Sequence, residues 1–238
     1  MSAFLYGVAL QWKLDIRSKT LLVTCYIVPL LFFALMGGIF TSINPAMKST
    51  FIQSMTVMGV SMGALIGLPP SLVETYGSDI KKVYKANGVP LYLGLVSMFI
   101  STFFHLMMMS IIIFLIAPIS FDAALPTNFP LYFISLAIFI VVSLSIGCIL
   151  GLIVKNQAKL TMVSQIIFLP SIMLSGIMFP IDLLPNIFEL VGKVFPAAWG
   201  YRLMLNNGFQ VENLWALLVF FIIALLLNFL LLKKQSAE

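Results

Sequence analysis

Six stretches of this 238-residue chain contain no Asp, Glu, Lys or Arg, and each is long enough to cross a lipid bilayer. A membrane helix needs about 20 mostly apolar residues. The stretches do not alternate between polar and apolar positions, as the strands of a membrane barrel do. They therefore predict an all-α integral membrane protein. Its six transmembrane helices are expected at about residues 21–41, 51–73, 91–116, 131–153, 160–179 and 213–232.

The composition supports one membrane domain over residues 1–238. Hydrophobic residues make up 61% of the chain and charged residues 9%, against about 45–50% and 25% in soluble domains. The first apolar run is too long for a cleaved signal peptide, so we expect it to span the membrane. Two cysteines in apolar runs and a single histidine predict neither a disulfide framework nor a metal centre. Without a basic run interleaved with aromatic residues, nucleic-acid binding is not expected.

The distribution of Lys and Arg predicts the orientation. If the N-terminus is cytoplasmic, ten of these residues fall in cytoplasmic segments, and only Lys48, Lys193 and Arg202 fall outside. Cytoplasmic loops carry the excess of positive charge in membrane proteins. We therefore expect a multi-pass protein of the cell membrane with both termini in the cytoplasm.

Residues 2–18 form an amphipathic segment before the first span. Apolar residues recur every three or four positions, whereas Gln11 and Asp15 fall on the other side. Trp12, Lys13 and Arg17 suit a helix that lies in the membrane interface among lipid headgroups. The simplest interpretation is a surface anchor.

Residues 74–90 form the longest cytoplasmic loop. Ser78 can cap a short helix that begins at Asp79, and Asn87-Gly88 can end it. The loop would then present a short charged helix between two membrane helices. Alternatively, it is a solvated connection whose lysines only fix the topology.

Residues 182–205 form an unusual outer segment before the last span. Glu189, Lys193 and Arg202 make it too polar to span, but its many apolar residues are unusual for a loop. Two short helices broken at Pro196 and partly embedded from outside would fit. Irregular backbone at membrane depth must be covered by protein or line a cavity.

The interiors of the spans carry no acidic or basic residue except His105. Ion-coupled carriers generally need such groups, so their absence argues against a self-powered pump. His105 shares a face with Ser97 and Ser101; it is either a neutral hydrogen-bonded side chain or a proton-relay or substrate contact. Gly59 and Gly63 have helix-packing spacing and predict close packing or a surface that moves during transport.

The fifth predicted span has a weakly polar face rich in methionine and aromatic residues. Such a face could guide an amphipathic substrate, because methionine adapts to varied apolar shapes. It could equally be ordinary bundle interior. The candidate residues are Gln165, Phe168, Met173, Ser175 and Met178.

Two motifs go beyond hydropathy. The first comprises Ser175-Gly176, Phe179-Pro180, Leu184-Pro185, Pro196, Trp199 and Arg202; the second comprises Glu74, Gly77 and Gly88-Val89-Pro90. Together with the predicted spans, they resemble the permeases of the type-2 ABC exporter family over nearly the whole chain.

The resemblance implies a non-catalytic permease without a bound cofactor, in a bacterial cell membrane. ATP and Mg would bind to two separate cytoplasmic ATP-binding subunits. A second permease copy or a paralogue would complete a dimer within the membrane lipids. The first loop would be a coupling helix that contacts the ATPase through Glu74, Tyr76, Gly77, Asp79, Lys81, Lys82, Tyr84 and Gly88.

The resemblance also implies a translocation path and a gate. The path or dimer seam would be lined by Gly59, Gly63, Gln165, Phe168, Met173, Ser175 and Met178. The extracellular gate would comprise Phe179, Pro180, Pro185, Pro196, Trp199 and Arg202.

The expected function is ATP-driven export of a hydrophobic or amphipathic compound, such as a drug or antimicrobial peptide. A lipid-linked glycan is the second candidate substrate within the family. Outside the family, the alternatives are an ATP-independent channel and a membrane immunity protein that binds a peptide without moving it.

Overall fold

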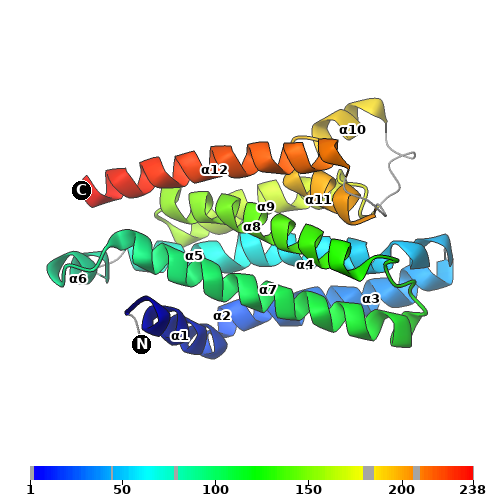
Figure 1. Cartoon of the computed structure of the whole chain (residues 1–238), viewed down its shortest axis with the longest axis horizontal. Coiled ribbons are helices and arrows are strands. Elements are labelled where there is room, and N and C mark those ends of the chain that lie inside the picture. The colour runs from blue at the N-terminus through cyan, green and yellow to red at the C-terminus, as the bar shows by residue number, and fades with distance from the viewer. Residues whose placement is uncertain (1–2, 44, 78–79, 179–184, 206–209, 238) are drawn as a thin grey trace.

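The computed structural model describes residues 3–43, 45–77, 80–178, 185–205 and 210–237, and every regular element in these residues is a helix (Figure 1). The predicted all-α class is therefore confirmed. In chain order, the elements are α1 (Ala3–Arg17), α2 (Lys19–Leu22), η1 (Val23–Ile27), α3 (Val28–Ile43), η2 (Pro45–Ser49), α4 (Phe51–Met62), η3 (Gly63–Gly67), α5 (Leu68–Tyr76), α6 (Ile80–Ala86), α7 (Leu91–Phe121), α8 (Phe129–Ile153), α9 (Gln157–Met173), α10 (Asn186–Gly192), α11 (Pro196–Leu205) and α12 (Val211–Ala237).

Five helices among the described residues are long and apolar enough to cross a membrane. Their lengths range from 22 to 31 residues, which exceeds the roughly 20 residues that a bilayer requires. They are Lys19–Phe40, Phe51–Tyr76, Leu91–Phe121, Phe129–Ile153 and Val211–Gln235.

The span expected at 160–179 falls on α9, which has only 17 residues. At 1.5 Å per residue, α9 rises about 26 Å, less than the roughly 30 Å of a hydrocarbon core. The helix ends three residues after Pro170, and the chain then turns through Gly176 with a positive φ of 85°. Five candidate spans are thus present among the described residues, and the expected sixth is not confirmed.

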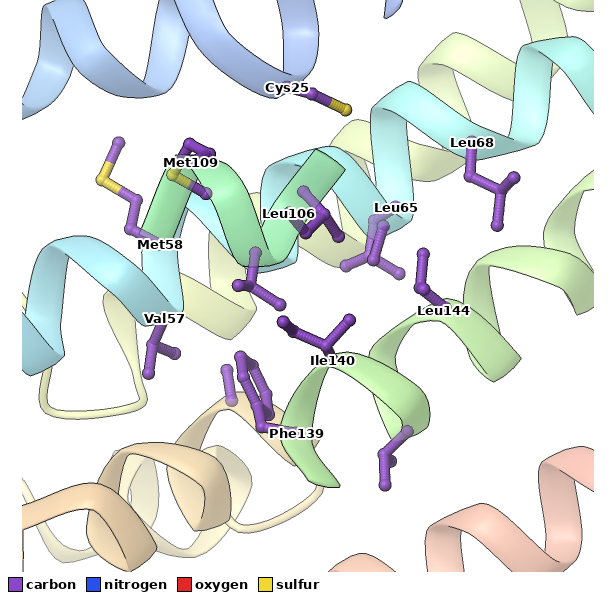
Figure 2. Packing of buried hydrophobic residues seen from close by; sticks show 14 of the residues in the cluster. Cys25, Val57, Met58, Leu65, Leu68, Leu106, Met109, Phe139, Ile140 and Leu144 are labelled. Carbon is purple, nitrogen blue, oxygen red and sulfur yellow. The ribbon is translucent and has the colours of Figure 1, made fainter. Parts of the chain in front are cut away.

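The continuous helix Phe51–Tyr76, made of α4, η3 and α5, is the centre of the bundle. Of its most apolar 18 residues, 89% are buried, against 22% for Lys19–Phe40 and 17% for Val211–Gln235. A Cβ on Gly147 of α8 would clash with the carbonyl oxygen of Ala64, so the two backbones are in close contact. Figure 2 shows side chains from this helix, α7 and α8 interlocking around Leu65, Leu106 and Ile140.

The last helix, α12, lies at the edge of the bundle and packs mainly on α8 (Figure 1). Two side-chain amides fix it there. Asn228 Nδ2 donates to the carbonyl oxygen of Ser145 at 2.8 Å, and Gln235 Nε2 donates to that of Leu152 at 3.2 Å. Hydrogen bonds of this kind hold membrane helices together where burial of apolar surface gives little.

Short helices occupy both ends of the bundle (Figure 1). Helix α6, the N-terminal part of α1 and the C-terminal part of α12 lie at one end, and α10 and α11 lie at the other. We call these the α6 end and the α10 end.

Candidate functional site

Helix α6 connects α5 to α7 at the α6 end. The Tyr76 hydroxyl, at the end of α5, donates to the carbonyl oxygen of Leu91, the first residue of α7, at 2.5 Å. Tyr76 is buried, whereas Glu74 and Gly77 are exposed. Tyr76 was expected to contact an ATP-binding subunit. In the structure its hydroxyl forms a buried hydrogen bond between two candidate spanning helices.

The remaining residues of the expected coupling surface lie on α6 or next to it. Lys82 and Gly88 are exposed, and Lys81 and Tyr84 are half-buried. Tyr84 packs against Gly94 of α7, where an added Cβ would lie 2.9 Å from its ring. Asp79 lies outside the described residues.

The C-terminal end of α6 is closed by local hydrogen bonds. Asn87 Nδ2 donates to the carbonyl oxygen of Val83 at 2.8 Å, and the Val89 amide donates to that of Tyr84 at 2.9 Å. Gly88 has φ of +65°, a conformation that glycine adopts without strain. The expected Asn-Gly helix end is therefore present.

Sequence reasoning missed two apolar residues of α6. Ile80 and Val83 are 41% and 56% exposed, and they lie among the lysines of this helix. Their three-residue spacing on a helix was the signal that could have identified them. Exposed apolar side chains rimmed by charge are typical of a surface that another protein covers.

Helix α1 packs along the first half of α7. The indole of Trp12 stacks on the imidazole of His105, with ring centroids 4.1 Å apart and planes within 4°. Lys13 and Arg17 are exposed, as expected for an interfacial helix. The face shared by Ser97, Ser101 and His105 is therefore covered largely by α1.

Asp15 was expected on the side of α1 opposite the apolar residues, and the structure shows that Asp15 is buried there against α7. Its side chain is only 3% exposed and accepts hydrogen bonds from Ser101 Oγ and, at 2.7 Å, from Gln11 Nε2. Burial raises the pKa of the Asp15 carboxyl, and the hydrogen bonds from Ser101 and Gln11 partly offset this effect.

His105 joins three helices. Its Nδ1 lies 2.8 Å from the hydroxyl of Tyr26, which comes from the first candidate span. Its Nε2 is buried and has no hydrogen-bond partner among the described residues. His105 is therefore fixed between Tyr26 and Trp12, which is compatible with both the structural role and the relay role.

The residues expected along a path or dimer seam are not brought together within the chain. Gly59 and Gly63 face α7, where added Cβ atoms would meet Met109 and Leu106. On or just after α9, Phe168 and Ser175 are buried, Met178 is half-buried, and Gln165 and Met173 are exposed.

The exposed side of α9 forms an apolar stripe that the sequence analysis did not identify. Met162, Ile166, Leu169 and Met173 are each more than half exposed and recur every three or four residues. Gln165 lies beside this stripe and is also exposed. We call these five residues the α9 stripe.

At the α10 end, α10 and α11 are linked by ion pairs around Glu189. Its Oε1 lies 3.1 Å from Lys193 Nζ and 3.4 Å from Arg202 Nη2. These two cations lower the pKa of Glu189, the hydrogen bond from Lys193 contributing most. The guanidinium of Arg202 also lies 5.6 Å from the ring centroid of Trp199.

The rest of the expected gate is partly described. Trp199 Nε1 donates to the carbonyl oxygen of Lys193 at 2.7 Å. Pro185 is the exposed residue before α10, and Pro196 is the first residue of α11, a position that proline favours. The two short helices expected on either side of Pro196 are therefore present. Phe179 and Pro180 lie outside the described residues.

Comparison with known proteins gives a family. Residues 3–209 match the family model described as ABC-2 type transporter. The probable multidrug ABC transporter permease YbhS of Escherichia coli, strain K12, is 39% identical over 70 residues, which are 29% of this chain. The same protein from E. coli O157:H7 matches equally. The aligned stretch covers 18% of the length of YbhS.

Proposed function

The chain belongs to the ABC-2 type transporter family, and on that premise we propose that it exports a hydrophobic or amphipathic compound with energy from separate ATP-binding subunits. A permease domain of this family is a non-catalytic membrane component. The observation that carries the proposal is the family match, which runs from α1 through α11 and takes in both ends of the bundle.

We assign six crossings, with α9 as the fifth. Helix α1 and the C-terminal end of α12 lie at the same end of the bundle (Figure 1), which requires an even number of crossings. The turn from Leu174 to Met178 extends the reach of α9 beyond its 17 residues. The bias of Lys and Arg assigns the α6 end to the cytoplasm.

The ATP-binding subunits would dock on α6. Its exposed Ile80 and Val83, with the neighbouring lysines and Glu74, provide an apolar patch with a charged rim. The Tyr76–Leu91 hydrogen bond joins α5 and α7, the two helices that α6 connects. A push on α6 would therefore reach two spanning helices at once.

The second permease copy would pack on the α9 stripe. An exposed glutamine on a membrane helix is costly in lipid unless another helix accepts its hydrogen bonds. Gln165 beside an apolar stripe meets this condition if a second copy covers it. Gly59 and Gly63, which pack inside the chain, would not line this seam.

The α10 end would close the path toward the outside. Glu189, Arg202 and Trp199 hold α10 and α11 together, so these helices can move as one unit. The substrate is assigned to the hydrophobic or amphipathic class because the spans carry no fixed charge. YbhS, a probable multidrug permease by name, supports the same class.

The test begins with affinity purification of the tagged chain from its host, followed by inverted vesicles of the host membrane. A co-purifying ATPase and ATP-dependent uptake of a labelled amphipathic compound are expected. Val83→Glu should remove both, because it places a charge in the apolar patch of α6. Leu190→Glu is the matched control for docking of the ATPase: Leu190 is 68% exposed but lies on α10, at the other end, so the ATPase should still co-purify.

Three other results would change this proposal. Uptake without ATP by the purified chain would favour a passive channel. Binding of the compound without uptake would favour an immunity protein. Accumulation of a lipid-linked glycan in a deletion strain would replace the substrate class but leave ATP-driven export in place.

A further inference from the structure

A cavity of about 510 Å³ lies between α1 and the connection from α6 to α7. Tyr6, Leu10 and Leu14 line it from α1, and Val89 and Leu93 line it from the opposite side. Ligand sites for small molecules and cofactors usually measure about 300–1,000 Å³. We call this cavity the α1–α7 groove.

The lining of the groove is apolar with a few polar groups. Its polar lining residues include Gln11, Ser97 and Tyr84, all of which carry hydrogen-bond donors. A molecule that fits both kinds of surface has a hydrocarbon part and one or two acceptor oxygens. The acyl chain and ester carbonyl of a phospholipid have this composition.

The groove lies where lipid chains meet their headgroups. Helix α7 has 31 residues and rises about 46 Å, so it extends beyond a hydrocarbon core of about 30 Å. The groove adjoins its first two turns, at Leu93 and Ser97. Leu10 and Leu14 of α1 are 45% and 52% exposed, so the α1 wall of the groove offers apolar surface that a lipid chain can contact.

The charge beside the groove is positive. Lys13, Arg17 and Lys19 are exposed on α1 and at the start of α2. The one acidic residue of α1, Asp15, is buried and faces Ser101. Basic side chains at the membrane surface attract anionic headgroups.

We propose that the α1–α7 groove binds one anionic phospholipid, with an acyl chain between Leu10 and Leu93 and the phosphate near Lys13 and Arg17. The ester carbonyl accepts a hydrogen bond from Ser97 or Tyr84. The bound lipid contacts both α1 and the α6–α7 connection. The site is independent of the transported substrate, and its occupancy does not require an ATPase.

The test uses the full-length chain in nanodiscs of equal parts phosphatidylglycerol and phosphatidylcholine. A trace of phosphatidylglycerol with a diazirine in its acyl chain is photolysed, and labelled peptides are mapped by mass spectrometry. Labelling is expected at the peptides that contain Leu10 and Leu93. Leu10→Glu should reduce it about tenfold, because a carboxylate against an acyl chain is strongly disfavoured.

Leu5→Glu is the matched control. Leu5 is 53% exposed on the same helix but does not line the groove, so its substitution should leave labelling within about twofold. Leu10→Met keeps the apolar wall and should label like the original chain. These two variants separate loss of the site from loss of α1 binding to the membrane.

A headgroup comparison tests the charge. Lys13→Gln combined with Arg17→Gln should abolish the preference for phosphatidylglycerol over a phosphatidylcholine probe, while the labelled peptides stay the same. Equal labelling of the groove and the outward side of α12 would mean bulk lipid and overturn the proposal. So would equal effects of Leu10→Glu and Leu5→Glu. If no lipid labels the groove and an added ATPase protects the groove instead, the groove is a docking site for that protein and not a lipid site.

Discussion

Two carboxyl groups, Asp15 of α1 and Glu189 of α10, stabilise their helices in opposite ways. Asp15 is buried between α1 and α7 with hydrogen-bond donors but no cation, and burial raises its pKa. Glu189 is partly exposed between Lys193 and Arg202, and these cations lower its pKa. Helix α1 is thus held by buried hydrogen bonds, which salt hardly affects. Helices α10 and α11 are held by surface ion pairs, which salt weakens.

The largest expected effect tests whether packing rather than charge holds the α10 end. Gly192→Ala places a Cβ against the carbonyl oxygen of Leu174, so α10 must move away from the end of α9. We expect a loss of about 3 kcal/mol in the free energy of unfolding, measured by denaturant titration in detergent. Gly38→Ala is the control, because a Cβ there has no neighbour within 4 Å. Equal losses at both sites would show that the close approach is unimportant.

The next effect concerns the buried carboxyl. Asp15→Ala leaves the fully buried hydroxyl of Ser101 without its acceptor and also removes the acceptor of Gln11, which should cost about 2 kcal/mol. Lys13→Ala, on the exposed side of the same helix, should change stability by less than about 0.5 kcal/mol. If both variants behave alike in the same titration, burial of Asp15 does not stabilise α1.

A change of pH should alter the local stability of α1 and that of α10–α11 in opposite directions. Because the folded-state pKa of Asp15 is raised above its ordinary value of 3.8, its contribution is present at low pH and is lost as pH rises through the folded-state pKa. Because that of Glu189 is lowered from 4.5, its contribution is present above 4.5 and is lost as pH falls through the folded-state pKa.

The measurement is hydrogen exchange of α1 and of α10–α11, corrected for the intrinsic pH dependence of exchange. Acid should protect α1 and expose α10–α11. Asp15→Asn should remove the response of α1 alone. A common response of both regions would indicate global unfolding and remove the distinction between the ends.

The smallest effect is expected for Glu189→Gln. Exposed ion pairs contribute little to stability at physiological salt, so the midpoint of unfolding should hardly change. The rate of hydrogen exchange in α10–α11, by contrast, should no longer depend on salt concentration. A continuing salt dependence would assign it to other charges of this end.

The sequence predicted the membrane helices well because an uncharged apolar run of about 20 residues matches the thickness of a bilayer. It predicted the outer helices because Pro196 favours the first turn of a helix. The length of α9 was not predictable to the same degree, because the apolar run continues past Met173 although the helix ends there. Only the folded bundle shows where the chain turns.

The sites were harder to predict than the fold. The burial of Asp15 was not predictable, because its hydrogen-bond partner in α7, Ser101, lies 86 residues away in the chain. Gly59 and Gly63 were correctly read as a close-packing pattern, but sequence does not reveal whether the neighbour is α7 or a second copy. Exposed Ile80 and Val83 were hidden among lysines, since single apolar residues in a charged segment carry little signal.

The two amides that hold α12 have a consequence for biogenesis. Asn228 and Gln235 bond to carbonyl oxygens of α8, and only 17% of the most apolar stretch of α12 is buried. The core around Phe51–Tyr76 therefore needs little from α12. Because the ribosome delivers α12 after α1–α11, we expect it to enter the bilayer as an independent segment. It would then find its place on α8 by matching two amides to two carbonyl groups.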